Sequence, residues 1–176
     1  MSRTWTDKEI RRARARAEAG DSFAQREFAT MLASGSIGTP DYREALKWYR
    51  KAAEAGDADA QYNLGLMYIF AEGVRKDVNV GMRWLRASAL RGNDVAEDTL
   101  GQIYERGAFG VRKNSSMALK WYRAAARHGN DKAKFNLGLW YISRGTSAQR
   151  RVGKKLVRDA ARAGVVDAKK FLKSAS

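Results

Sequence analysis

Residues 59–68 have the sequence DAQYNLGLMY, and the spacing of small and apolar residues in this segment returns along most of the chain. The repeat is marked by glycines at intervals of 36, 36, 37 and 35 residues: Gly20, Gly56, Gly92, Gly129 and Gly164. An alanine lies four residues after each of these glycines. A tryptophan lies eight residues before three of them: Trp48, Trp84 and Trp121. So many aligned columns predict an array of similar structural units.

Each unit is predicted to contain two helices joined by a polar turn. Ala60, Leu64 and Tyr68 have helical spacing and mark one face of a first helix. Trp84 and Leu85 begin a similar pattern on a second helix. The repeat glycines are expected where second helices end, because glycine tolerates the left-handed backbone conformation that is common there.

Three local signals indicate where helices start. Thr6 and Glu9 have the spacing of a capping box, in which each side chain binds the other residue's backbone N–H. Asp77 is expected to be an N-cap, and Thr39 followed by Pro40 is a further start signal.

A second set of glycines lies inside the first helices, at Gly65, Gly101 and Gly138. A glycine in a helix interior costs about 1 kcal/mol relative to alanine, so its recurrence predicts a close approach of two helix backbones. Pairs of small residues on the second helices are expected to face these glycines: Ala52-Ala53, Ser88-Ala89, Ala125-Ala126 and Ala160-Ala161.

The complete pattern is Ala-x-x-x-Leu-Gly-x-x-Tyr, then Gly-Val before a polar turn, then Trp-Tyr-x-x-Ala-Ala. It resembles the Sel-like repeat family, which is related to the tetratricopeptide repeats. Residues 59–68 and 47–53 carry the resemblance most clearly, and it extends from about Ile10 to Phe171. The resemblance implies an all-α fold, a right-handed α-solenoid of about four stacked antiparallel helix pairs with terminal capping helices.

A single repeat domain is expected over residues 1–176. Its segments are an N-terminal helix at 5–19, repeats at 21–56, 57–92 and 93–129, an atypical repeat at 130–164 and a C-terminal capping helix at 165–176. The fourth repeat is atypical because Leu156 replaces the tryptophan and Gly153 replaces an alanine. End units of such arrays deviate because they cap the stack.

The composition gives no sign of catalysis. The chain has no cysteine and one histidine, His128, so neither a metal-ligand set nor a nucleophilic triad can be assembled around them. His128 is expected to be exposed at a helix end, and Glu97-Asp98 is expected to form a solvated face. We therefore expect a protein that is not an enzyme and needs no cofactor or metal. We also expect a cytoplasmic protein, because residues 1–19 lack a signal-like apolar segment and the longest apolar run, 64–71, is too short to span a bilayer.

A partner-binding groove is implied by the resemblance, since the first helices of tetratricopeptide-like arrays line the concave side. Groove positions in the first repeat fall at Phe23, Arg26 and Thr30. The other proposed partner-binding residues are Tyr62, Leu66, Phe70, Asp98, Gln102, Glu105, Arg106, Lys132, Phe135 and Leu139. The alternative, that several of these side chains only pack against neighbouring units, stays open.

The net charge of +15 is concentrated near the C-terminal end, where residues 130–176 hold 12 Lys and Arg against 3 Asp and Glu, a net of +9. The candidate basic patch is Arg150, Arg151, Lys154, Lys155, Arg158, Arg162, Lys169, Lys170 and Lys173. Two interpretations stay open, a solvated surface that aids solubility and a surface that attracts an acidic partner or nucleic acid.

The leading functional hypothesis is an adaptor or scaffold that binds another protein or peptide, and that protein is expected to be acidic. Resemblance to small bacterial proteins of this family suggests one dedicated partner, such as a regulator or a toxin for which this protein is the immunity factor. The alternative is binding of nucleic acid or an anionic surface through the basic C-terminal region. No membrane span is expected, and a monomer is favoured.

Overall fold

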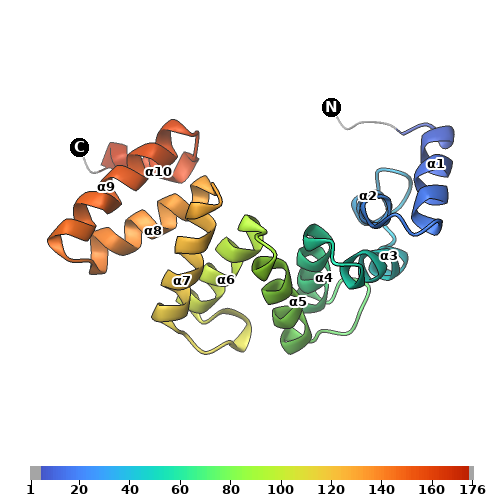
Figure 1. The fold of residues 1–176 in the computed structure, drawn as a ribbon, viewed down its shortest axis with the longest axis horizontal. Coiled ribbons are helices and arrows are strands. Elements are labelled where there is room, and N and C mark those ends of the chain that lie inside the picture. Colours follow the sequence, from blue (N-terminus) through green and yellow to red (C-terminus); the bar gives the residue numbers. More distant parts are fainter. Residues whose placement is uncertain (1–4, 175–176) are drawn as a thin grey trace. The chain divides into compact units, whose positions relative to one another are not determined.

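The computed structural model describes residues 5–174, which form ten α-helices and one short 3-10 helix without a β-strand (Figure 1). Residues 1–4 and 175–176, the ends of the domain predicted over 1–176, lie outside the described residues. The described chain divides into two compact units, residues 5–91 and 92–174. The predicted all-α architecture of helix pairs is confirmed, and the single domain stays a prediction.

Both units are built from helices that pack against their neighbours in sequence. The first unit contains α1 (Asp7–Glu18), α2 (Ser22–Ser34), α3 (Tyr42–Glu54), α4 (Ala58–Phe70) and α5 (Val78–Leu90). The second unit contains α6 (Asp94–Arg106), the 3-10 helix η1 (Ala108–Gly110), α7 (Ser115–Arg127), α8 (Asp131–Arg144), α9 (Ser147–Arg162) and α10 (Val166–Ser174).

The five repeat glycines follow the ends of α1, α3, α5, α7 and α9, as predicted. Their φ angles lie between +85° and +98°, a region that side chains with a Cβ rarely adopt. Each glycine lets the chain reverse direction after a helix, so that the next helix packs against the one just completed.

Asp or Asn side chains cap the start of seven of the helices. Each accepts a hydrogen bond from the backbone N–H three residues later, which satisfies one of the helix's unpaired donors: Asp21, Asp41, Asp57, Asp77, Asn93, Asn114 and Asn130. The predicted Asp77 cap and the Thr6–Glu9 capping box are confirmed. The helix start predicted from Thr39 and Pro40 was wrong in its position. Helix α3 starts after Asp41, whose carboxylate accepts a hydrogen bond from the Glu44 N–H at 2.9 Å.

Gly65 and Gly138 do allow two helix backbones to approach, but not at the predicted small pairs, whereas Gly101 makes room for the ring of Tyr122. A Cβ on Gly65 would lie 3.0 Å from the carbonyl oxygen of Gly81 and 3.0 Å from the side chain of Leu85. A Cβ on Gly138 would lie 2.9 Å from the carbonyl oxygen of Gly153. The close contact therefore falls one or two turns before Ser88-Ala89 and Ala160-Ala161. Helical spacing identifies the face of a helix, but it does not fix the crossing point.

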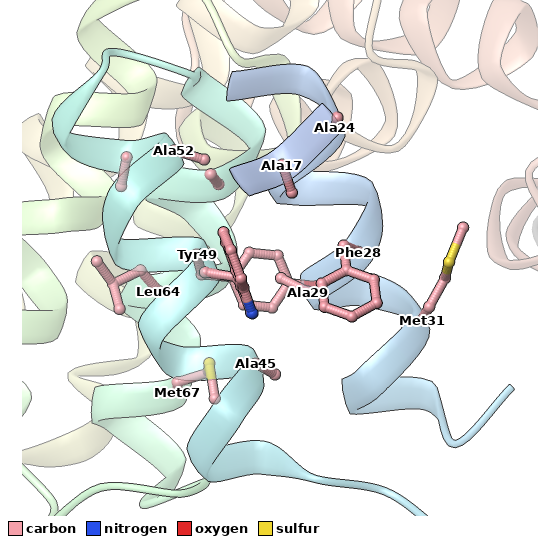
Figure 2. Packing of buried hydrophobic residues seen from close by; sticks show 13 residues of the cluster. Ala17, Ala24, Phe28, Ala29, Met31, Ala45, Tyr49, Ala52, Leu64 and Met67 are labelled. Carbon is pink, nitrogen blue, oxygen red and sulfur yellow. The ribbon is translucent and has the colours of Figure 1, made fainter. Parts of the chain in front are cut away.

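The core of the first unit lies between α2, α3 and α4 (Figure 2). Ala29 and Ala45 are completely buried there, so the α2 and α3 backbones approach closely. Phe28 meets the ring of Trp48 edge to face, with centroids 5.7 Å apart. Such an arrangement is the favoured geometry of an aromatic pair, and it makes the α2–α3 pair a firm support for the side chains on its outer face.

Candidate functional site

The predicted groove residues of the first unit lie on matching stripes of α2 and α4. Tyr62, Leu66 and Phe70 follow Asp59 at intervals of three, four and four residues, which places all four on one stripe of α4. On α2 the residues at the same positions of the repeat are Phe23, Arg26, Thr30 and Ser34. We call these two stripes together the α2–α4 face.

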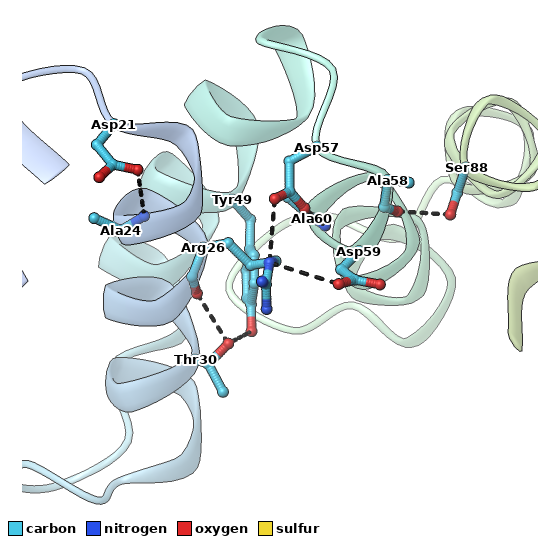
Figure 3. Close-up of polar contacts among 10 residues, drawn as sticks. All are labelled: Asp21, Ala24, Arg26, Thr30, Tyr49, Asp57, Ala58, Asp59, Ala60 and Ser88. Carbon is cyan, nitrogen blue, oxygen red and sulfur yellow. Dashed lines mark hydrogen bonds and ion pairs between the residues drawn. The ribbon is translucent and has the colours of Figure 1, made fainter. Parts of the chain in front are cut away.

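Arg26 joins the two stripes through charge (Figure 3). Its Nε lies 3.2 Å from Oδ2 of Asp57 and 3.7 Å from Oδ2 of Asp59. Asp57 has two roles, because its other carboxylate oxygen accepts the Ala60 N–H at 2.7 Å and caps α4. The guanidinium also lies 4.7 Å from the centre of the Phe23 ring, a cation–π contact. Phe23 and Asp59 thus both contact one cation.

Thr30 links the face to the helix behind it (Figure 3). Its hydroxyl donates to the carbonyl oxygen of Arg26 at 2.9 Å. Because a hydroxyl has a single proton, the 2.9 Å contact between Thr30 and Tyr49 is a hydrogen bond that Tyr49 donates. Burial of Tyr49 raises the pKa of its hydroxyl. This contact of Tyr49 was not predictable from the repeat pattern, since its column belongs to the core side of the second helices.

A shallow pocket of about 280 Å³ opens beside α2. It is lined by Trp5, Arg26, Glu27, Thr30, Met31, Ser34 and Ser36. Its size is below the range of about 300–1,000 Å³ that is typical of small-molecule sites. The pocket has room for a side chain of another protein. Because Arg26 and Thr30 line the pocket, it lies on the α2–α4 face.

Two aromatic side chains on the α2–α4 face are open to solvent. Phe23 is 48% exposed and Phe70 is 54% exposed. Tyr62 and Leu66 lie between Asp59 and Phe70 on the stripe and are half-buried. Large apolar groups held on a rigid pair of helices are the usual anchors of protein interfaces.

Several of the predicted groove residues of the second unit are engaged in contacts within that unit. Asp98 is only 5% exposed, and its carboxylate accepts hydrogen bonds from Gln102 at 2.8 Å and from Asn136 at 2.9 Å. The Asn136 bond ties α6 to α8. The interpretation of Glu97-Asp98 as a solvated face was wrong, because both residues are buried.

Burial raises the pKa of Asp98 above its ordinary 3.8, against the opposing effect of the hydrogen bonds from Asn136 and Gln102. The folded protein therefore binds this proton more tightly than the unfolded chain. The resulting stabilisation is complete below 3.8 and is lost as the pH rises through the raised pKa. We expect the wild type to gain stability relative to Asp98→Asn as the pH falls from 7 towards 3.8.

Urea unfolding of both proteins across this pH range measures the effect. The other titrating groups are present in both proteins, so their contributions cancel when the two free energies of unfolding are subtracted. The hydrogen bond that Asp98→Asn removes shifts this difference by an amount that does not depend on pH. A difference that stays constant, or that favours Asp98→Asn at acid pH, would contradict the burial of this carboxylate.

Glu105 and Phe135 also have partners inside the second unit. Glu105 accepts a hydrogen bond from the Tyr122 hydroxyl at 2.9 Å and lies 3.6 Å from Nη1 of Arg144. Burial, together with this bond to a carboxylate, raises the pKa of Tyr122. Phe135 is half-buried and meets Phe171 of α10 edge to face, with centroids 6.3 Å apart. Gln102 and Leu139 are half-buried, whereas Arg106 and Lys132 are exposed.

His128 is at the C-cap of α7, as predicted, but it has a buried partner that the sequence did not reveal. Its Nδ1 lies 2.8 Å from Oε2 of Glu97. The Glu97 side chain is 4% exposed, whereas that of His128 is 48% exposed. The pair fastens the end of α7 to α6, which is a structural contact.

The nine residues of the predicted basic patch are all exposed, six on α9 and three on α10. Among residues 5–174, no cluster of three or more His, Asp or Glu is arranged to hold a metal ion. Within the same residues, no helix combines the length and apolar character needed to cross a bilayer.

Comparison with known proteins places this geometry in a family. The Sel1 repeat matches residues 22–57, 58–93 and 98–130. A Sel1 repeat protein from Oxalobacter formigenes is similar at 30% identity and a TM-score of 0.81, over 94% of this chain and 74% of its own length. No curated protein matches the chain.

Two further solved structures extend the comparison. The protective antigen c5321 of uropathogenic Escherichia coli is 31% identical with a TM-score of 0.82, over 89% of this chain; the chain spans about a third (33%) of that protein's length. The immunity protein PA5088 of Pseudomonas aeruginosa shares the fold at 21% identity and a TM-score of 0.60, over 94% of this chain and 60% of its own length.

Proposed function

Because this chain belongs to the Sel1 repeat family, whose helical fold is generally a scaffold for protein interaction and not for catalysis, we propose that it binds a partner protein or peptide through the α2–α4 face. The observation that carries the proposal is the exposure of Phe23 and Phe70 on that face. The Arg26 network supports it by fixing Phe23 in place.

The α2–α4 face combines the features that an interface needs. Phe23 and Phe70 supply apolar anchors, with Tyr62 and Leu66 beside them on the stripe. Asp59 adds a charge that gives a partner its orientation. The pocket beside α2 accepts one side chain of the partner. Arg106 and Lys132, exposed on first helices of the second unit, are proposed as additional contacts.

The partner that we propose is one dedicated protein of a bacterial cell, such as a regulator or a toxin that this protein neutralises. The solved relatives come from bacteria. The immunity protein of Pseudomonas aeruginosa has the same fold, and at this low sequence identity the likeness extends to the fold alone. Affinity purification with the full chain from the native cell identifies the partner.

We expect Phe23→Ala/Phe70→Ala to weaken binding of that purified partner at least about tenfold, because truncation of an anchor residue typically costs about 2 kcal/mol. Titration calorimetry with the wild type and the variant measures the change. Both side chains are about half exposed, so the variant should remain folded, and thermal unfolding checks this.

The matched control is Tyr42→Ala/Leu90→Ala. These residues are exposed on the second helices of the same unit, at 39% and 78%, and lie off the α2–α4 face. The control should bind the partner with the affinity of the wild type. Unchanged binding by a folded Phe23→Ala/Phe70→Ala protein, or an equal loss in both variants, would reject the α2–α4 face as the site.

A further inference from the structure

Six basic side chains of α9 lie on one face of the helix. At 3.6 residues per turn, they fall within an arc of about 140°, and they extend along about 18 Å of the helix axis. This α9 basic face consists of Arg150, Arg151, Lys154, Lys155, Arg158 and Arg162, all of which are exposed. The sector of the helix next to this arc is buried against the unit, through Gly153, Val157 and Ala160. Packing therefore fixes which way the charges point.

Most of these charges are not neutralised by the protein. Arg162 lies 3.8 Å from Asp159, and Arg150 donates from Nε to the carbonyl oxygen of Gly145. Within residues 5–174, no carboxylate forms an ion pair with the other four basic residues of the face. Two exposed cations of the first unit, by contrast, have a carboxylate partner: Arg14 pairs with Glu18 at 2.9 Å, and Lys47 pairs with Glu44 at 2.7 Å.

The chemistry of the α9 basic face fits a polyanion better than a protein. Protein interfaces depend on buried apolar or aromatic anchors, and lysine is depleted in their centres. The face has no such anchor, because Val152, the exposed apolar residue of α9, lies outside the arc. Single-stranded nucleic acid is held by stacking on aromatic rings, and the face has none. A duplex offers a negative charge about every 1.7 Å of its axis and needs no stacking.

We propose that the α9 basic face binds the phosphate backbone of double-stranded nucleic acid without sequence specificity. Lysine and arginine both contact phosphate oxygens, and such contacts carry no sequence information. Lys169, Lys170 and Lys173 are exposed on α10 of the same unit and add to the local positive potential. This function is separate from partner binding through α2 and α4.

The test uses the full chain and a fluorescein-labelled DNA duplex of about 21 base pairs, two helical turns. Fluorescence anisotropy is measured over a series of salt concentrations. We expect the logarithm of the binding constant to fall linearly with the logarithm of the salt concentration. The slope should approach about −5 if all six side chains contact phosphates. Two duplexes of unrelated sequence should bind equally.

Neutralising three residues of the face tests its role directly. Lys154→Gln/Lys155→Gln/Arg158→Gln should weaken binding at least about tenfold and make the slope shallower by about 2.7, or 0.9 for each contact. The matched control is Arg12→Gln/Arg43→Gln/Arg83→Gln on exposed positions of α1, α3 and α5. Both variants lower the net charge from +15 by three, to +12, and the control should keep the slope of the wild type.

Three results would overturn the proposal. One is an absence of duplex binding at low salt. Another is an equal loss in the two triple variants, which would mean that only net charge matters. The third is loss of the purified protein partner in the α9 variant without duplex binding, which would assign the face to an acidic protein. The Phe23→Ala/Phe70→Ala protein should still bind the duplex, so the two proposals fail independently.

Discussion

Gly81→Ala should destabilise the protein by about 1–3 kcal/mol, although the same change in an isolated helix stabilises it by about 1 kcal/mol. The reason is the crossing of α4 and α5. A Cβ on Gly81 would lie 2.7 Å from the carbonyl oxygen of Gly65 and 2.6 Å from Cγ1 of Ile69. The Ile69 side chain can move, but the carbonyl belongs to the backbone of α4, so the two helices must separate. Gly81→Val should cost more than about 3 kcal/mol.

Urea unfolding monitored by circular dichroism measures this change in the free energy of unfolding. Ala45 provides the matched control, because it occupies the same position of the repeat in α3 and is completely buried. Ala45→Gly should be destabilised for the ordinary reason, the poor helix propensity of glycine. A Gly81→Ala protein that is as stable as the wild type, or more stable, would show that α4 and α5 do not cross at these glycines.

His128→Ala should lower the free energy of unfolding by about 2 kcal/mol, because it leaves the Glu97 carboxylate buried without this partner. The cost arises at Glu97, since the imidazole itself is about half exposed. Loss of the contact also frees the end of α7 from α6. Chemical unfolding of the single variant and the wild type at the same pH gives the difference.

A double variant separates this explanation from a general weakening of α7. Glu97→Met/His128→Ala replaces the carboxylate with an apolar side chain of similar size, so no charge is left buried. Its stability should lie within about 1 kcal/mol of the wild type. If the double variant is as unstable as His128→Ala, or less stable, the cost does not come from the orphaned carboxylate.

The helices and their ends could be predicted from the sequence because they depend on residues close together in the chain. The repeat glycines end helices through their own left-handed conformation, and Asp77 caps α5 through a bond to a residue three positions later. The Thr39–Pro40 error is also local. Asp41 is a better N-cap than Thr39, and the sequence alone is sufficient to identify it.

The candidate site was only partly predictable. The resemblance selected Tyr62, Leu66 and Phe70, which lie along one stripe of α4, and the charge distribution selected the basic residues of α9, which are exposed. Their role in binding stays a prediction. Helical spacing did not distinguish an exposed position from one that a neighbouring helix covers. Asp98 and Phe70 lie on equivalent stripes of α6 and α4, yet the first is buried under contacts from α8 and the second is open.

By itself, the sequence determined the class of fold, the length of the repeat and the concentration of positive charge near the C-terminal end. Repeat spacing is a local pattern, and net charge is a sum over residues, so neither depends on tertiary contacts. Only the tertiary structure decided which side chains meet. Arg26 and Asp57 are 31 residues apart, as are Glu97 and His128, and each pair is brought together by helix packing. The crossing at Gly65 and Gly81 has the same origin. These contacts depend on how far one helix slides and turns against the next, and the shapes of all the packed side chains together set that position.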